Sequence, residues 1–317
     1  MNASSTFPGG LPTTIPEYLD RLRVALAGAD PALVQDALYD AEEYLRSELA
    51  ENPGKNEAEV IAAVAGSYGA PDEVADIYRD TEVKVQAALR TPMSPPRRSA
   101  LGRFFGVVVD PRAYAALFYM LLSLATGIFY FTWVVAGASV SLSMLVLIIG
   151  IPLLLLFLGS VRVLSLVEGR LIEVMLGERM PRRPLYANRG RPWQQRIAEL
   201  FTDPRTWGTL LYFVAMLPLG VGYFTIAVTL LALSLAFIAA PIAVWTGLAT
   251  ANVDYAGWQV VGLDGTAWGT SAEAWMLPLM LLGGVLLLFI TLHVARGIGR
   301  LHGMLAKHLL VKSAQYN

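Results

Sequence analysis

The chain has 317 residues, of which 55% are hydrophobic and 15% are charged, and its mean hydropathy is +0.52. Soluble domains carry about 25% charged residues, so this composition excludes an entirely soluble globular protein. The charge is divided unevenly: residues 1–100 hold 16 acidic and 9 basic side chains, whereas residues 101–317 hold 9 acidic and 15 basic ones. The absence of cysteine from the sequence excludes disulfides and thiolate metal sites. We therefore expect an acidic soluble domain joined to a basic, apolar membrane domain.

Residues 1–14 lack the basic and apolar stretches of a signal peptide, so we expect a disordered N-terminus that is not cleaved. Residues 15–90 show helical spacing of their apolar side chains and predict four short helices. Asp30 before a proline is typical of a helix start, and Asn56–Glu59 predicts a capping box. The last helix follows a Gly-Ala-Pro turn, and its expected inner face holds Val74, Ile77 and Tyr78.

Three pieces of this domain resemble the HAAS signalling domain, a small helical module at the N-terminus of bacterial membrane proteins. They are YLDRLRVAL (18–26), YDAEEYLRSEL (39–49) and SYGAPDEVADIYR (67–79). The resemblance implies a cytoplasmic signalling role. The second helix has an acidic face that is either a solvated surface or a docking surface for a basic partner. That face carries Asp36, Asp40, Glu43 and Glu48.

Residues 91–103 form a linker rich in proline and arginine, and an internal repeat follows it. DPRAYAALFYM from Asp110 returns as DPRTWGTLLYF from Asp203. Eleven of 26 aligned positions are identical, including the pairs Tyr119/Tyr212, Gly127/Gly220 and Tyr130/Tyr223. Each copy opens with an aspartate that caps a helix, a proline that suits its first turn and an arginine that suits the headgroup level. The repeat predicts two helical hairpins, residues 104–177 and 203–310, that start from the same membrane face.

The apolar runs of both hairpins are long enough to cross a bilayer, which predicts four transmembrane helices. Neither hairpin has a lysine or arginine after its opening arginine until Arg162 and Arg296, whereas residues 162–205 hold nine arginines. By the positive-inside rule, we expect both termini, the basic loop 178–202 and the tail 311–317 in the cytoplasm of a bacterial inner membrane.

Residues 231–250 leave the number of spans open, because they are apolar enough for a fifth one. A fifth span would put the basic C-terminal tail outside the cell, so we favour four. The segment is then re-entrant, interfacial or an extension of the third helix, with Pro241 as its bend. The predicted fold class is all-α: a small N-terminal helical domain and a membrane domain of two repeated hairpins.

Two stretches resemble the sensor domain that precedes the catalytic core in many actinobacterial histidine kinases: DPRTWGTLLYFVAMLPLGVGYFT (203–225) and ARGIGRLHGMLAKHLL (295–310). In that family a kinase core follows the sensor. Because the sequence stops at Asn317, we expect neither a phosphoacceptor helix nor an ATP-binding domain, and no enzymatic activity. The resemblance implies a sensor that hands its signal to a separate protein.

The basic loop is a candidate lipid-interface site. A basic amphipathic helix beside a membrane attracts anionic lipid, although it also serves as a simple topological anchor. The candidate residues are Arg182, Arg183, Arg189, Arg191, Trp193 and Arg196.

The outer loop 250–275 interrupts the repeat and is the candidate ligand site. Its aromatic and acidic side chains suit a cationic or amphiphilic ligand, and equally suit a membrane interface. A hairpin is expected there with its turn at Asp264-Gly265. The candidate ligand-binding residues are Asp254, Tyr255, Trp258, Asp264, Trp268 and Glu273.

We expect no catalytic, metal or cofactor site. The three histidines are not spaced as a zinc pair, and His302 is expected at the interface or in the tail. Glu168 and Glu173 are expected to form surface ion pairs with neighbouring arginines. No acidic residue is expected within the hydrocarbon stretches, which argues against an ion-coupled transporter.

These features predict a multipass membrane sensor or signalling-regulatory protein without a catalytic output domain. It would relay an envelope, lipid or extracellular cue to a cytoplasmic kinase or transcription regulator through its acidic N-terminal domain. The alternative is an accessory or assembly subunit of a transporter or envelope complex. Membrane lipid is an expected partner, self-association is open, and direct nucleic-acid binding is not expected.

Overall fold

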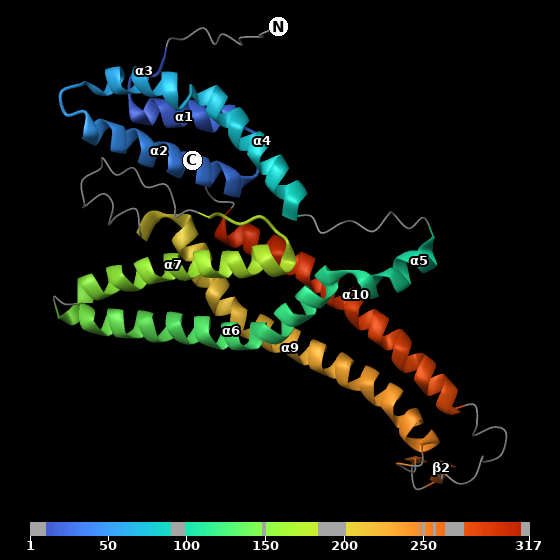
Figure 1. Cartoon of the computed structure of the whole chain (residues 1–317). Coiled ribbons are helices and arrows are strands. Elements are labelled where there is room, and N and C mark those ends of the chain that lie inside the picture. Colours follow the sequence, from blue (N-terminus) through green and yellow to red (C-terminus); the bar gives the residue numbers. More distant parts are fainter. Residues whose placement is uncertain are drawn as a thin grey trace.

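The computed structural model describes residues 11–89, 99–147, 150–182, 201–246, 248, 251–255, 258–263 and 276–311. Within these residues the chain forms a small helical head, residues 15–89, above a body of four long helices (Figure 1). The predicted all-α class is confirmed, with one small two-stranded sheet in addition.

The head consists of four helices whose starts are encoded locally. They are α1 (Ile15–Ala25), α2 (Pro31–Glu51), α3 (Glu57–Ser67) and α4 (Pro71–Leu89). The Asp30 carboxylate accepts the Ala32 N–H at 2.9 Å, and Asn56 and Glu59 form the predicted capping box. Each cap satisfies amides that a helix start leaves without a partner, so the sequence fixes where these helices begin.

The core of the head is mainly apolar, and Tyr18 lies buried within it. Tyr18 is buried, its hydroxyl donates to the Gly69 carbonyl oxygen at 2.8 Å, and burial raises the pKa of its phenol. Val74 packs in this core as predicted. Ile77 does not, because it is 58% exposed.

The body consists of α6 (Pro111–Ser143), α7 (Gly150–Leu176), α9 (Pro204–Trp245) and α10 (Met276–Leu310). Each is long and apolar enough to cross a membrane. Asp110 and Asp203 cap α6 and α9 in the same way, each accepting the backbone N–H of the following arginine. A short helix, α5 (Ala100–Phe105), begins inside the predicted linker, and the 3-10 turn η1 (Gly106–Val109) leads from it to α6.

The segment that left the number of spans open belongs to the third long helix. α9 continues without interruption through Trp245 and contains Pro218 and Pro241 within its length. A proline inside a helix removes one backbone hydrogen bond, and α9 continues past both of its prolines. Of the alternatives, the extension of the third helix is therefore correct.

α6 and α9 cross at the two repeated glycines. A Cβ atom on Gly127 would collide with the carbonyl oxygen of Met216, and one on Gly220 with that of Ser123. These four positions are equivalent in pairs in the repeat, so α6 and α9 make equivalent contacts with each other at the crossing. Higher residue numbers on α6 meet lower residue numbers on α9, so the two helices run in opposite directions (Figure 1).

The expectation that both hairpins start from one membrane face stays a prediction. The free end of the α6–α7 hairpin and the free end of the α9–α10 hairpin lie at opposite ends of the body (Figure 1). The repeat specifies where each helix begins and where its glycine lies. It does not specify the direction in which two glycine surfaces meet, because backbone approaches backbone equally closely either way.

The outer loop contains an antiparallel hairpin of β1 (Ala251–Tyr255) and β2 (Trp258–Leu263). The expected first strand, from Trp258 onward, is present as β2. Its partner β1 precedes it in the chain, whereas the expected partner was to follow the turn. The predicted turn at 264–265 lies outside the described residues.

Candidate functional site

Six polar side chains meet inside the body and form what we call the polar core. All four long helices contribute to it. Glu168 and His302 are both 0% exposed, and Tyr119, Tyr130 and Tyr212 are buried around them. The members are Tyr119 and Tyr130 from α6, Glu168 from α7, Tyr212 and Tyr223 from α9, and His302 from α10.

Three phenols donate to the single carboxylate. The hydroxyls of Tyr119 and Tyr212 lie 2.7 and 2.9 Å from Glu168 Oε1, and that of Tyr130 lies 2.9 Å from Oε2. A buried carboxylate is costly unless donors surround it, and these three phenols supply the donors. The carboxylate thus joins α6 and α9 to α7 through hydrogen bonds at their crossing.

His302 joins α10 to the same group. Its Nε2 lies 2.6 Å from the Tyr119 hydroxyl and 2.9 Å from that of Tyr212, while Nδ1 lies 3.4 Å from the Tyr223 hydroxyl. Each phenol has one proton, which Tyr119 and Tyr212 donate to Glu168, so the single Nε2–H of the imidazole is shared between their two oxygens. The polar core is therefore one network, and moving any helix breaks bonds to two others.

The sequence-based expectations for Glu168 and His302 were wrong. Glu168 is a bundle residue within α7, and His302 is neither interfacial nor in the tail. The expectation that the long helices contain no buried acidic residue is therefore also wrong, because Glu168 lies buried within α7. A signal was available, since Tyr119/Tyr212 and Tyr130/Tyr223 are identical in the repeat. Polar side chains retained in both copies of an apolar helix indicate a common buried partner.

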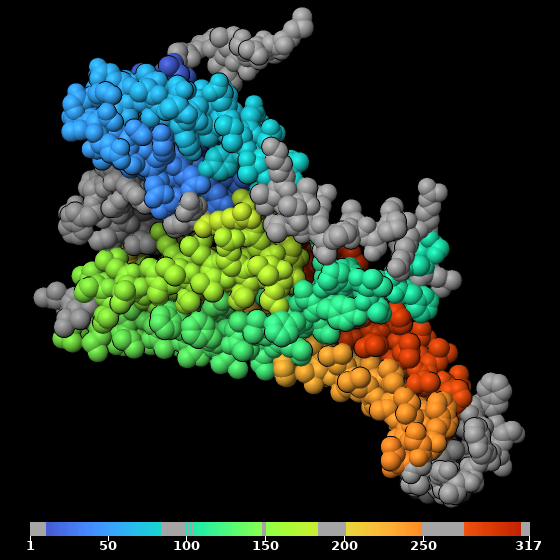
Figure 2. Space-filling view, in the orientation of Figure 1, coloured from blue at the N-terminus to red at the C-terminus, as the bar shows by residue number. Residues whose placement is uncertain are grey.

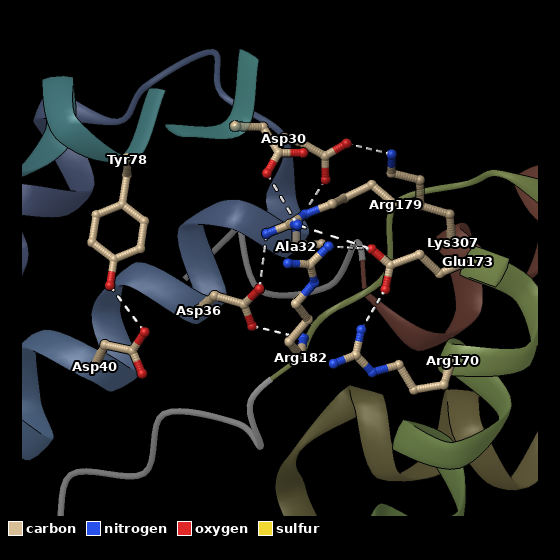
Figure 3. Close-up of polar contacts among 11 residues, drawn as sticks. Asp30, Ala32, Asp36, Asp40, Tyr78, Arg170, Glu173, Arg179, Arg182 and Lys307 are labelled. Atoms are coloured by element: carbon tan, nitrogen blue, oxygen red, sulfur yellow. Dashed lines mark hydrogen bonds and ion pairs between the residues drawn. The ribbon is translucent and has the colours of Figure 1, made fainter. Parts of the chain in front are cut away.

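The head rests on the body through a docking face, which we define as Asp30, Ala32, Gln35 and Asp36 of α2 with Arg179, Arg182, Arg205 and Lys307 of the body. Asp36 Oδ2 pairs with Arg179 Nη2 at 2.9 Å, and Oδ1 accepts the Arg182 backbone N–H at 2.7 Å (Figure 3). The side chains of Asp36 and Arg179 are only 6% and 10% exposed. Asp36, expected on a solvated or partner-binding face, is thus engaged by the chain itself.

Further contacts extend the docking face on both sides of this pair. Arg205 Nη1 donates to Gln35 Oε1 at 2.8 Å, and Lys307 pairs with Asp30. Ala32 is fully buried in the same apolar cluster as Met180 and Ala306 of the body. In the space-filling view the blue head lies against the yellow-green segment at the end of α7 (Figure 2).

Glu173 organises the arginines beneath the head. Its carboxylate pairs with Arg170 at 2.8 Å and with Arg182 at 2.9 Å (Figure 3). The hydrogen bond to Glu173 raises the pKa of the Arg182 guanidinium. Arg179 completes the set by pairing with Glu82 of α4 at 3.0 Å. The predicted pairing of Glu173 with neighbouring arginines is confirmed, although these pairs support the docked head.

Three helices connect the polar core directly to the docking face. His302 and Lys307 are five residues apart on α10, about 7.5 Å along its axis. On α9, Tyr212 and Arg205 are seven residues apart, about 10 Å. On α7, Glu168 is five residues from Glu173, which holds Arg182 of the docking face at 2.9 Å. A change in helix packing at the polar core would therefore displace docking residues on rigid elements.

The two candidate sites from the sequence are described only in part. In the outer loop, Tyr255 lies opposite Trp258 and Asp254 opposite Gln259, which brings three of the candidate residues to one hairpin end. Asp264, Trp268 and Glu273 lie outside the described residues. Of the lipid-interface candidates, Arg182 belongs to the docking face, while Arg183, Arg189, Arg191, Trp193 and Arg196 lie outside the described residues.

In the part of the chain that the structure describes, no group of three or more His, Asp or Glu side chains could hold a metal ion. The polar core has one carboxylate and one imidazole, too few ligands for zinc. The polar core instead links the four long helices through hydrogen bonds.

Four long apolar helices beneath a small helical head define a membrane protein with an N-terminal soluble domain. The family model described as "Putative sensor" matches residues 119–310, and the HAAS model matches residues 17–77. The chain therefore belongs to this sensor family and carries an N-terminal HAAS domain, as the two resemblances implied. These two domains fit a role in membrane sensing and signalling. Searches of the curated proteins and of the solved structures each returned no match.

Proposed function

We propose that this protein senses an envelope, lipid or extracellular cue through its body and relays it by releasing or repositioning the head. The observation that carries the proposal is the continuity between the two polar sites. The same helices that meet at Glu168 and His302 hold the head through Arg205 and Lys307. A cue that repacks the body changes the geometry of both sites at once.

The head is the output element in this proposal. Its partner is a cytoplasmic signalling protein, such as a kinase or a transcription regulator, that recognises the acidic face of α2. Asp30 and Asp36 are covered when the head is docked and become available when it is released. The chain itself supplies no catalytic step.

We place the protein in a bacterial inner membrane with the head, the arginine-rich segments and both termini in the cytoplasm. The positive-inside rule supports this, since Lys307 and the three arginines of the docking face lie together with the head. The β1–β2 hairpin then lies at the outer end of α9 and α10.

The relay is tested by distance measurements between spin labels. The cysteine-free sequence allows two labels to be attached at Val24→Cys on the head and Met304→Cys on α10, both exposed positions. We expect one narrow distance in nanodiscs, and a broad distribution when Glu168→Gln is added. Glu43→Gln, an exposed residue of the head, is the matched control. A narrow distance that survives Glu168→Gln would refute the relay.

The partner is identified by capture from native membranes with the undocked Asp36→Asn variant beside the wild type. Recovery of a kinase or transcription regulator in amounts that change with Asp36→Asn supports the signalling role. Recovery of transporter or envelope subunits in equal amounts from both supports the accessory-subunit alternative.

A further inference from the structure

A cavity of about 120 Å³ lies where the head, α7 and α9 meet. The helix ends of the body and the side of α2 form its wall. Its polar lining consists of two arginines, three hydroxyl residues and one amide. These residues are Gln35, Arg162, Ser165, Arg205, Thr206 and Thr209.

Arg205 is the central group of this cavity. It is 4% exposed, and Nη1 is held by Gln35 Oε1 at 2.8 Å. Among the described residues, Nη2 has no hydrogen-bond partner although it is buried. A buried guanidinium nitrogen without an acceptor is costly, so an oxygen atom of a bound ligand would complete the hydrogen bonding of this guanidinium.

The surroundings favour an anion. Arg162 also lines the cavity, and Asp203, at 3.2 Å from Arg162 Nη2, is the carboxylate that offsets part of this charge. The Thr206 hydroxyl lies 3.3 Å from the same nitrogen, and Thr209 adds a second hydroxyl to the wall. Among the described residues at the cavity, two guanidinium groups are balanced by one carboxylate, which favours an anion. Arginine forks with adjacent hydroxyls match the oxygens of a phosphate group.

We propose that this cavity binds a phosphate oxyanion at the junction of head and body. Arg205 Nη2, Arg162 and Thr209 contact the oxygens, while Arg205 Nη1 keeps its bond to Gln35. The same chemistry is offered by the headgroup of an anionic lipid and by free phosphate. The Asp-Pro-Arg motif that begins α9 suits the level of the lipid headgroups, where both a headgroup and a free phosphate ion can reach the cavity.

Two binding experiments on the full chain separate the sources. Native mass spectrometry after extraction from phosphatidylglycerol nanodiscs counts retained lipid, and calorimetry in detergent titrates inorganic phosphate. Retained lipid without phosphate binding identifies the headgroup, and phosphate binding in detergent identifies the free ion. In either case we expect Arg205→Gln to weaken binding about tenfold to hundredfold, because a charge-assisted hydrogen bond is lost.

The repeat provides the control. Arg112 is the equivalent of Arg205 in the first hairpin, is exposed and does not line the cavity. Arg112→Gln is expected to leave binding unchanged. Thr209→Val removes one hydroxyl without touching the Gln35 bond, and it keeps the test valid should Arg205→Gln fail to fold. Equal losses for Arg112→Gln and Arg205→Gln, or no binding of either probe to a folded wild type, would overturn the proposal and leave a cavity that holds water alone.

Discussion

At the scale of single residues, a few buried polar groups carry most of the specificity of the body. A membrane-spanning helix pair gains little from apolar contact with another helix, because lipid tails are equally apolar. Hydrogen bonds between helices then decide which partners pack together. Glu168, which accepts from three phenols on two helices, is the residue on which this body depends most.

Replacing Glu168 by alanine should therefore destabilise the body strongly. The change leaves three buried phenols short of an acceptor, each worth about 1–3 kcal/mol, so we expect a loss of at least about 3 kcal/mol. Thermal unfolding in nanodiscs measures it. Tyr114→Phe, on an exposed tyrosine of α6, is the control and should shift the transition little. Equal transitions for the two variants would mean that the polar core does not hold the helices together.

At the scale of elements, the crossing of α6 and α9 depends on backbone proximity. The stacked rings of Tyr130 and Phe213, with centroids 4.4 Å apart, lie beside the glycine contacts and continue the same antiparallel order. Glycine permits this approach because it lacks the Cβ atom that would separate the helices. The repeat places one such glycine on each helix, so each hairpin supplies half of the crossing.

Gly220→Ala should separate this pair, since its Cβ would meet the Ser123 carbonyl oxygen, which cannot move without the α6 backbone. We expect a loss of about 1–3 kcal/mol, as for overpacking elsewhere. Gly222→Ala is a close control, because a Cβ there meets open space and alanine favours a helix by up to about 1 kcal/mol over glycine. Chemical unfolding of both variants decides the point, and a Gly220→Ala variant as stable as Gly222→Ala contradicts the crossing.

At the scale of the whole molecule, the uneven division of charge is explained in part by internal docking. The acidic head meets basic residues of the body through a largely buried pair, Asp36 and Arg179. Breaking a buried pair costs far more than breaking an exposed one. The head is consequently held by few contacts that can be lost together.

Asp36→Asn should undock the head, with a cost on the order of 3 kcal/mol. Asp76→Asn removes the same charge from an exposed pair with Arg79 and should cost no more than about 1 kcal/mol. The distance between labels at Val24→Cys and Met304→Cys reports the docked fraction for both. If Asp76→Asn broadens that distance as much as Asp36→Asn, net charge rather than the docking face holds the head.

The opposed hairpins make a prediction about labelling from either side of the membrane. Leu248→Cys, next to the β1–β2 hairpin, should react with a membrane-impermeant thiol reagent from outside, and Val24→Cys only from inside. Val146→Cys, at the free end of the α6–α7 hairpin, tests the direction of α6 across the bilayer. A cytoplasmic start of α6 puts Val146→Cys outside together with Leu248→Cys, whereas an α6 that crosses the bilayer in the direction opposite to α9 leaves Val146→Cys inside. Reaction of both from outside would show that the hairpins point the same way in the bilayer.

The helices, their caps and the long apolar segments could be derived from the amino-acid order alone. Asp30, Asn56, Asp110 and Asp203 begin the helices that their positions predicted, because a cap acts within one turn of chain. The family resemblances were also readable, since they depend on short continuous stretches such as 67–79 and 203–225.

Folding in three dimensions decided the burial of Glu168 and His302, the antiparallel crossing and the attachment of the head. Each depends on groups distant in sequence: Tyr119 and His302 are 183 residues apart, and Arg179 and Asp36 are 143. A glutamate between arginines has the same local pattern whether it faces water or three phenols. Only the packing of the other helices determines which of these environments it meets, because the energy of a buried charge is set by its partners in space.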